Sequence, residues 1–209
     1  MLIKHLKFIL LGSITIALTA GNSHADSSTY LRADVYHAKG DQSQNDFAGS
    51  LANHSFTLNR YDASRTAAQL ALGYQWSQFT YTEVGYLDLG DTEVDLTLNG
   101  NEDSAAFGKN FSKHFPRTGS GITLTQGLSL ALNSQWRASG EIGLFSWKDK
   151  AKLNAATIQF KDENGLDLIL GVRLDYQLSN ALGLGLSARR VTLDNQHVDL
   201  VGASAMWKF

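Results

Sequence analysis

Serine, histidine and acid side chains, the groups that many hydrolytic enzymes use, occur together near the C-terminal end of the sequence. His197 and Asp199 are two residues apart, and Ser187 and Ser204 lie on either side of them. A serine whose hydroxyl is deprotonated by a histidine, with an acid to orient that histidine, can attack an ester or amide carbonyl. Whether these side chains can meet depends on the elements that carry them.

Three histidines offer a second kind of chemistry. His37, His54 and His114 fall in or beside stretches without a regular apolar pattern, and loop histidines can converge as metal ligands. Their separations fit no recognised metal spacing. The sequence also lacks a glycine-rich phosphate cradle and a defensible pair of catalytic carboxylates. We therefore expect neither a metal nor another cofactor.

Charged residues form the largest candidate set, because they recur at alternate positions in segments that are otherwise apolar. Between Leu166 and Leu178, leucine, valine and tyrosine occupy one parity, whereas Asp167, Arg173 and Asp175 occupy the other. A period of two belongs to a strand and not to a helix. The charged residues that follow this rule are Arg32, Asp34, Glu83, Arg137, Glu141, Asp167, Arg173, Asp175 and Arg189.

The same alternation predicts eight strands. They are Tyr30–Ala38, Thr66–Trp76, Phe79–Thr97, Gly121–Asn133, Trp136–Trp147, Leu166–Leu178, Ala181–Leu193 and His197–Phe209. Very short connections around Ser77, Ser134 and Ser179 alternate with long ones over Lys39–Arg65, Asn99–Ser120 and Lys148–Gly165. An even strand number with tight turns at one end and long loops at the other is typical of bacterial outer-membrane barrels. The fold class predicted is all-β, an eight-stranded antiparallel up-and-down transmembrane β-barrel.

The first 25 residues have the organisation of a cleaved signal peptide. After a basic start, an apolar stretch from Phe8 to Leu18 leads to the small-residue ending Ser23-His24-Ala25. This stretch is too short to cross a membrane as a helix, which needs about 20 residues. We expect cleavage after Ala25, so that residues 26–209 form one barrel domain in the bacterial outer membrane.

Strand length and aromatic placement favour a membrane barrel over a soluble sandwich. A bilayer-crossing strand needs about 9 to 11 residues, whereas ordinary strands have about 5 or 6. Aromatic residues on the apolar parity lie close to the short turns or the C-terminus, as a membrane-interface belt would: Trp76, Trp136, Tyr176 and Trp207. The charged set then points into a narrow lumen, where its members must pair. The fallback interpretation is a soluble periplasmic all-β binding protein with a cavity.

Two segments resemble the small outer-membrane barrel family that includes the OmpA transmembrane domain and OmpX. Gly73-Tyr74-Gln75-Trp76, followed by Glu83–Leu87, is similar to the second hairpin of that family, and Val201–Phe209 is similar to its last strand. Proteins of the accessory colonization factor type are a further resemblance. The likeness covers essentially the whole chain after the signal segment.

This resemblance implies roles for a few residues. Glu83 matches the inward glutamate that pairs with an inward arginine to gate the lumen, but the sequence does not assign its partner. Trp207 and Phe209 match the C-terminal signal that the barrel assembly machinery reads. Some eight-stranded barrels modify lipid A with a serine, a histidine and an acid near the outer rim, but no histidine here has the spacing of that deacylase motif. We therefore expect no enzyme, and interpret His197 as a rim residue.

The expected function is structural, with a surface-interaction role in adhesion or colonization. A narrow pore for small solutes is the alternative, and a lipid A modifying enzyme ranks below it. The expected partners are outer-membrane lipids and lipopolysaccharide, the assembly machinery, and host or surface ligands that meet the outer loops. A net charge of -2 without a basic stripe argues against nucleic acid.

Overall fold

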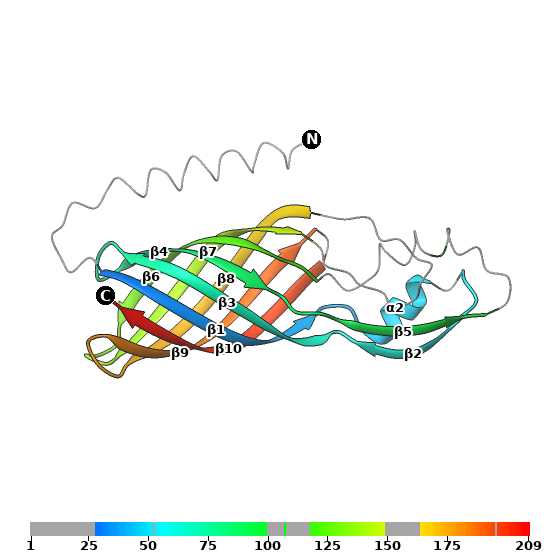
Figure 1. Ribbon diagram of the computed structural model, residues 1–209, viewed down its shortest axis with the longest axis horizontal. Coiled ribbons are helices and arrows are strands. Elements are labelled where there is room, and N and C mark those ends of the chain that lie inside the picture. Colours follow the sequence, from blue (N-terminus) through cyan, green and yellow to red (C-terminus); the bar gives the residue numbers. More distant parts are fainter. Residues whose placement is uncertain (1–27, 52, 100–106, 108–117, 149–163, 195) are drawn as a thin grey trace.

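The computed structural model describes residues 28–51, 53–99, 107, 118–148, 164–194 and 196–209. Within these residues eight antiparallel strands close into a barrel in the order β1-β10-β9-β8-β7-β6-β4-β3, which confirms the predicted fold class (Figure 1). They are β1 (Ser28–Gly40), β3 (Ser64–Gln75), β4 (Thr80–Asp88), β6 (Ser120–Ala131), β7 (Trp136–Lys148), β8 (Asn164–Gln177), β9 (Leu182–Leu193) and β10 (Gln196–Lys208). The predicted signal segment, residues 1–25, lies outside the described residues.

Alternation along each strand divides the side chains between two environments. On β1, Arg32 is 1% exposed and faces the lumen, whereas Val35 is 60% exposed and faces outward. The first and last barrel strands pair with each other, so Tyr30 lies opposite Lys208. Closure leaves no unpaired strand edge, as a lipid environment requires.

The long hairpin formed by β3 and β4 continues beyond the barrel. β2 (Phe56–Asp62) leads into β3 across Ala63, β5 (Glu93–Leu98) follows β4, and β2 pairs with β5 in a separate two-stranded sheet. Figure 1 shows this two-stranded sheet of β2 and β5, which we call the projecting hairpin, extending from the end of the barrel opposite the C-terminus. We call that end the long-loop end, and the other, with the turns at 76–79, 132–135 and 178–181, the short-turn end.

The prediction of one continuous strand over Phe79–Thr97 is wrong. The chain leaves the barrel after Asp88 and resumes strand structure at Glu93. Gly90 lies between them with φ 75°, a conformation that residues with a Cβ rarely adopt. After the bend, β5 no longer pairs with β6 and, among the described residues, pairs only with β2, the strand that leads into β3.

The expected loop over Lys39–Arg65 contains more regular structure than the sequence predicted. It holds β2 and a short helix, α2 (Gln44–Ser50). Ser43 caps this helix by accepting a hydrogen bond from the Asp46 backbone N–H, and the Asp46 carboxylate accepts one from the Ser43 backbone N–H. This reciprocal pairing satisfies two donors that a helix start leaves open.

Helix and hairpin share a small hydrophobic core outside the barrel, which we call the hairpin core. Its fully buried members are Phe47, Leu51 and Phe107, with Phe56, Leu58, Tyr61, Val94 and Leu96 packed around them. A register shift between Leu58 and Arg60 brings Tyr61 to the same face of β2 as Phe56, because one extra residue reverses the alternation.

Apolar side chains fill the part of the lumen nearest the long-loop end. This apolar tier consists of Tyr36, Ala38, Ala67, Leu87, Leu89, Phe145, Trp147, Ile169, Val191, Leu193, Val198 and Leu200, all buried. Leu193, Val198 and Leu200 come from the strand ends beside the last long-loop-end turn. The lumen is therefore layered, with apolar packing toward the long loops and charged groups beyond it.

Candidate functional site

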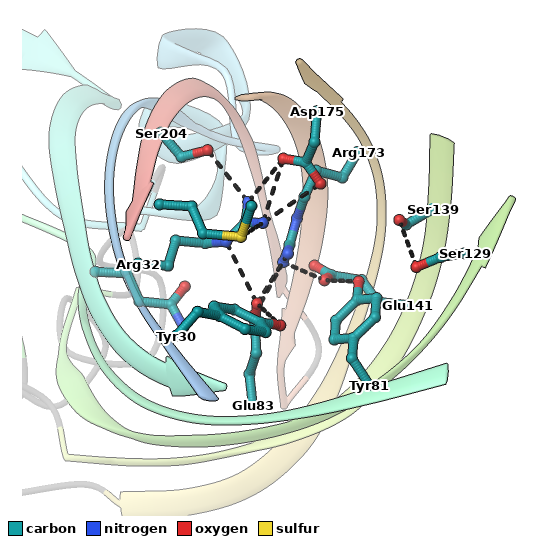
Figure 2. A network of polar contacts seen from close by, with 12 residues as sticks. Tyr30, Arg32, Tyr81, Glu83, Ser129, Ser139, Glu141, Arg173, Asp175 and Ser204 are labelled. Atoms are coloured by element: carbon teal, nitrogen blue, oxygen red, sulfur yellow. Dashed lines mark hydrogen bonds and ion pairs between the residues drawn. The ribbon is translucent and has the colours of Figure 1, made fainter. Parts of the chain in front are cut away.

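A cluster of buried ions occupies the middle of the lumen (Figure 2). Arg173 on β8 donates to both carboxylate oxygens of Glu83 on β4, from Nη1 at 2.8 Å and from Nη2 at 3.0 Å. Its Nη2 also donates to Glu141 Oε2 at 2.6 Å. Two acids from different strands thus share one guanidinium, whose planar fork suits bidentate pairing.

Two further arginines complete this cluster. Arg32 Nε lies 3.3 Å from Glu83 Oε1, and its Nη2 lies 3.2 Å from Asp175 Oδ1. Arg189 pairs with Glu141 and donates to the side-chain oxygen of Gln69. We call the six ions the charge network: Arg32, Glu83, Glu141, Arg173, Asp175 and Arg189.

Two tyrosines that the sequence analysis did not single out support the network. Tyr30 donates to Glu83 Oε1 at 2.8 Å, and Tyr81 donates to Glu141 Oε2 at 3.1 Å. Each ring lies over a glycine on the adjacent strand: a Cβ on Gly73 would come within 2.1 Å of Tyr30, and one on Gly127 within 2.0 Å of Tyr81. Alternation along the strand could have found both tyrosines, since Tyr30 lies on the same strand face as Arg32 and Tyr81 lies on the same face as Glu83.

Asp34 is buried beside the network but does not join it. Neither of its carboxylate oxygens has a hydrogen-bond partner among the described residues. The network itself holds three arginines and three acids, so its formal charges cancel without Asp34. A buried ion pair gains little net stability over an apolar core, but losing one partner is costly. Removing one member of the network should therefore cost more stability than removing Asp34.

The remaining two members of the predicted charged set lie at opposite ends of the lumen. Asp167 accepts a hydrogen bond from Trp147 Nε1 at 2.8 Å, next to the apolar tier. Arg137 lines a cavity at the short-turn end. Sequence parity assigned the strand face of both residues but did not show that they lie apart from the others.

The expected interface aromatics lie near the short-turn end. Trp136 and Trp207 are exposed on the outer face, and the ring centroids of Trp136 and Tyr176 are 4.9 Å apart. Trp76 is half-buried and donates to Thr82 Oγ1 at 2.8 Å. Toward the long loops, exposed Tyr86 donates to Ser120 Oγ at 2.7 Å. These rings combine apolar contact area with one polar contact, which suits a membrane interface.

The structure separates the candidate hydrolytic residues. Ser187 and Ser204 are buried on the lumen side. Asp199 is on the other face of β10, where it forms a bidentate ion pair with Arg190 at 2.6 and 2.7 Å. His197 pairs instead with Asp41 at 2.9 Å. A serine and a histidine on opposite faces of the barrel wall cannot exchange a proton directly.

The candidate metal ligands do not converge either. His37 is exposed on β1, and the His54 ring meets Phe107 edge-on at 5.3 Å. His114 lies outside the described residues. In the described part of the chain, no three histidine or acid side chains are grouped as a metal site would require.

One group outside the barrel has a shifted acidity. Tyr61 on the projecting hairpin donates its hydroxyl to the Gln42 carbonyl at 2.9 Å. Burial, and secondarily the charge of Asp41, raises the pKa of Tyr61 to about 12. Both effects disfavour the phenolate.

A closed barrel of eight strands, with a mostly apolar outer face, aromatic residues near its edges and a buried ion cluster in its lumen, defines a small bacterial outer-membrane protein. Residues 24–198 match the OmpA-like transmembrane domain, and the chain belongs to that family. By the rule for such barrels the short-turn end is periplasmic and the long-loop end extracellular. In the described residues no helix is long and apolar enough to cross a membrane.

Solved structures show the same fold at low sequence identity. The N-terminal β-barrel domain of Pseudomonas aeruginosa OprF is 10% identical with a TM-score of 0.53, covering 88% of this chain and 100% of that one. OprG from the same organism is 14% identical with a TM-score of 0.52, covering 90% and 98%. Neisserial surface protein A is 15% identical with a TM-score of 0.50, covering 88% and 99%.

These neighbours establish likeness of fold and no more. No curated protein sequence matches the chain.

Proposed function

We propose that this barrel is a structural and surface-interaction protein that displays its projecting hairpin for adhesion or colonization. The observation that carries the proposal is the hairpin core, in which Phe47, Leu51 and Phe107 are fully buried outside the barrel. Burying a large apolar side chain contributes about 1.5 to 3 kcal/mol. A loop with its own core presents a defined surface to a partner and loses less entropy on binding than a mobile one.

The contents of the lumen favour this role over a pore. A solute would have to pass both the charge network and the apolar tier, in which Trp147 and Phe145 are fully buried. An eight-stranded barrel has an interior that side chains fill. We therefore rank the narrow pore second, and lipid A modification below it because Ser187 and His197 lie on opposite faces of the wall.

Attachment of whole cells tests the surface role. A non-adherent Gram-negative strain producing the protein would be compared with one producing the double variant Phe47→Ser/Leu51→Ser, which removes two fully buried apolar side chains, one on α2 and one at its C-cap, from the hairpin core. We expect the wild type to promote attachment to cultured epithelial cells, and the double variant to reduce attachment to that of cells lacking the protein. The lipid-face change Val201→Leu, on an exposed side chain of β10, is the control.

The amount of folded barrel must be equal in all three strains, as a heat-dependent shift in electrophoretic mobility would verify. Equal attachment by wild type and double variant would contradict the proposal, as would wild-type cells that attach no better than cells lacking the protein.

The remaining partners follow from the membrane location. We propose that the outer face contacts lipopolysaccharide and other outer-membrane lipids, and that the assembly machinery reads the last strand through Trp207 and Phe209. Both side chains are exposed, at 53% and 73%, which supports their availability to a partner. Cleavage after Ala25 completes the proposed export route.

A further inference from the structure

The short-turn end of the lumen contains a cavity of about 80 Å³ that opens toward the periplasm. Arg32 and Arg173 of the charge network line it, and Arg137 and Lys208 join them. We call it the periplasmic vestibule. A volume of this size exceeds what one water needs and is sufficient for a small polyatomic ion.

Positive charge exceeds negative charge in this vestibule. Four cationic side chains line it, and Asp175 is the one acid among its lining residues. Both oxygens of Asp175 already accept hydrogen bonds from Arg32, at 3.2 and 3.4 Å. The acid that could neutralise a further cation is therefore already paired.

Two of the cations have no acidic partner. The Arg137 side chain forms no hydrogen bond or ion pair with the described residues, and Lys208 Nζ donates to a neutral acceptor, Gln177 Oε1, at 2.8 Å. The two come from β7 and β10, on different sides of the cavity. Confined charges interact more strongly in a poorly hydrated lumen than in bulk water, so an anion is attracted between them.

We propose that the periplasmic vestibule binds a phosphate group. A guanidinium fork and an ammonium approaching from separate strands suit a tetrahedral oxyanion, which offers acceptors in several directions. Arg137 supplies the fork and Lys208 the point charge, and the charge network, whose ions are already paired, forms the floor of the vestibule. The group enters from the periplasm and goes no further, because the charge network closes the lumen above it.

Calorimetric titration of the purified barrel in maltoside micelles, which contain no phosphate, tests this site. Inorganic phosphate and pyrophosphate are the probes, at low ionic strength. We expect saturable binding that weakens about tenfold in Arg137→Gln, as loss of one charge-assisted contact predicts, and becomes undetectable in Arg137→Gln/Lys208→Gln. Arg137 has no internal partner to lose, so its variant should fold, and the heat-dependent mobility shift verifies this.

Lys148→Gln is the matched control, since Lys148 is an exposed cation at the opposite end of the barrel. Its binding should equal that of the wild type. The proposal is overturned if the wild type binds neither probe, or if Lys148→Gln weakens binding as much as Arg137→Gln does.

A second arm separates the two sources of a phosphate group in this position. The titration is repeated in nanodiscs made with phosphatidylglycerol. Loss of phosphate binding there, with binding retained in micelles, identifies a lipid headgroup of the inner leaflet as the occupant. Retained binding in nanodiscs identifies a soluble periplasmic phosphate compound.

Discussion

Arg173 and Glu83 form a bidentate ion pair across the lumen, with contacts of 2.8 and 3.0 Å between residues 90 positions apart. Their strands, β8 and β4, are not neighbours in the barrel, since β7 and β6 lie between them. The ion pair therefore connects two strands, β8 and β4, that share no backbone hydrogen bond. It also identifies the arginine partner of Glu83 that the sequence could not assign.

Glu83→Gln should lower the free energy of unfolding by about 3 to 5 kcal/mol, because it leaves buried arginines without their counter-charge. Urea unfolding in lipid vesicles, followed by tryptophan fluorescence, measures the change. Asp34→Asn is the control: it removes an acid with no hydrogen-bond partner among the described residues, so it should cost far less or stabilise. Equal losses in both variants would contradict the assigned pairing.

Gly127→Ala should destabilise the barrel by about 1 to 3 kcal/mol, the usual range for overpacking. Its new Cβ would meet the Tyr81 ring at 2.0 Å, and that ring is fixed by its bond to Glu141. Gly140→Ala is the matched control on β7, because nothing lies within 4 Å of its Cβ position. In a double-mutant cycle, Gly127→Ala should cost much less in a Tyr81→Ala background, and additive losses would show that ring and glycine do not interact.

Planar bilayers containing the wild-type protein should show no regular conductance steps. Glu83→Gln should also remain closed, because the apolar tier seals the lumen independently of the ions. Single-channel recording at both polarities makes the measurement. Uniform steps in the wild type that vanish in Glu83→Gln would instead favour the narrow pore.

Phe209→Ala should cause a severalfold drop in the folded protein recovered from the outer membrane, since an exposed terminal aromatic is available to the assembly machinery. The purified, folded variant should unfold much like the wild type, because this side chain is 73% exposed. Pulse-chase of the heat-dependent mobility shift separates assembly from stability. Unchanged assembly kinetics would remove Phe209 from the proposed signal.

Tyr61 should ionise with a pKa near 12, against an ordinary value of 10.0. A folded-state pKa above the unfolded one means that the neutral phenol is stabilised by folding. This contribution to hairpin stability is complete below about pH 10 and is lost as the pH rises toward 12. The difference in alkaline absorbance titration between wild type and Tyr61→Phe isolates this group, and an ordinary pKa would show that the hairpin core does not bury it.

The alternation of side chains was sufficient to predict the barrel, but not the projecting hairpin. Val94 and Leu96 continue the period of two, so their spacing does not indicate that the chain leaves the barrel wall after Asp88. The helix α2 spans only seven residues, too few for its period to be recognised. Its capping pair, Ser43 and Asp46, was the available signal.

Parity also assigned the lumen face of the charged residues, because it depends only on position along one strand. The contacts among them depend on how far the strands are staggered around the barrel, which a single sequence does not state. The apolar tier was missed for a different reason. Trp147, Ile169 and Val191 share the parity of the charged residues, but parity gives only the face of a strand and not where along the lumen apolar side chains replace charged ones.

The apolar tier also sets an order on biogenesis. Once β1 and β10 have joined, the finished lumen offers no route by which the charged side chains of the projecting strand β2, Arg60 and Asp62, could be moved to the cell exterior. Driving those charges through hydrocarbon is unfavourable. Strand β2 must therefore be translocated while the seam between β1 and β10 is still open, and closing that seam is the step that makes translocation irreversible.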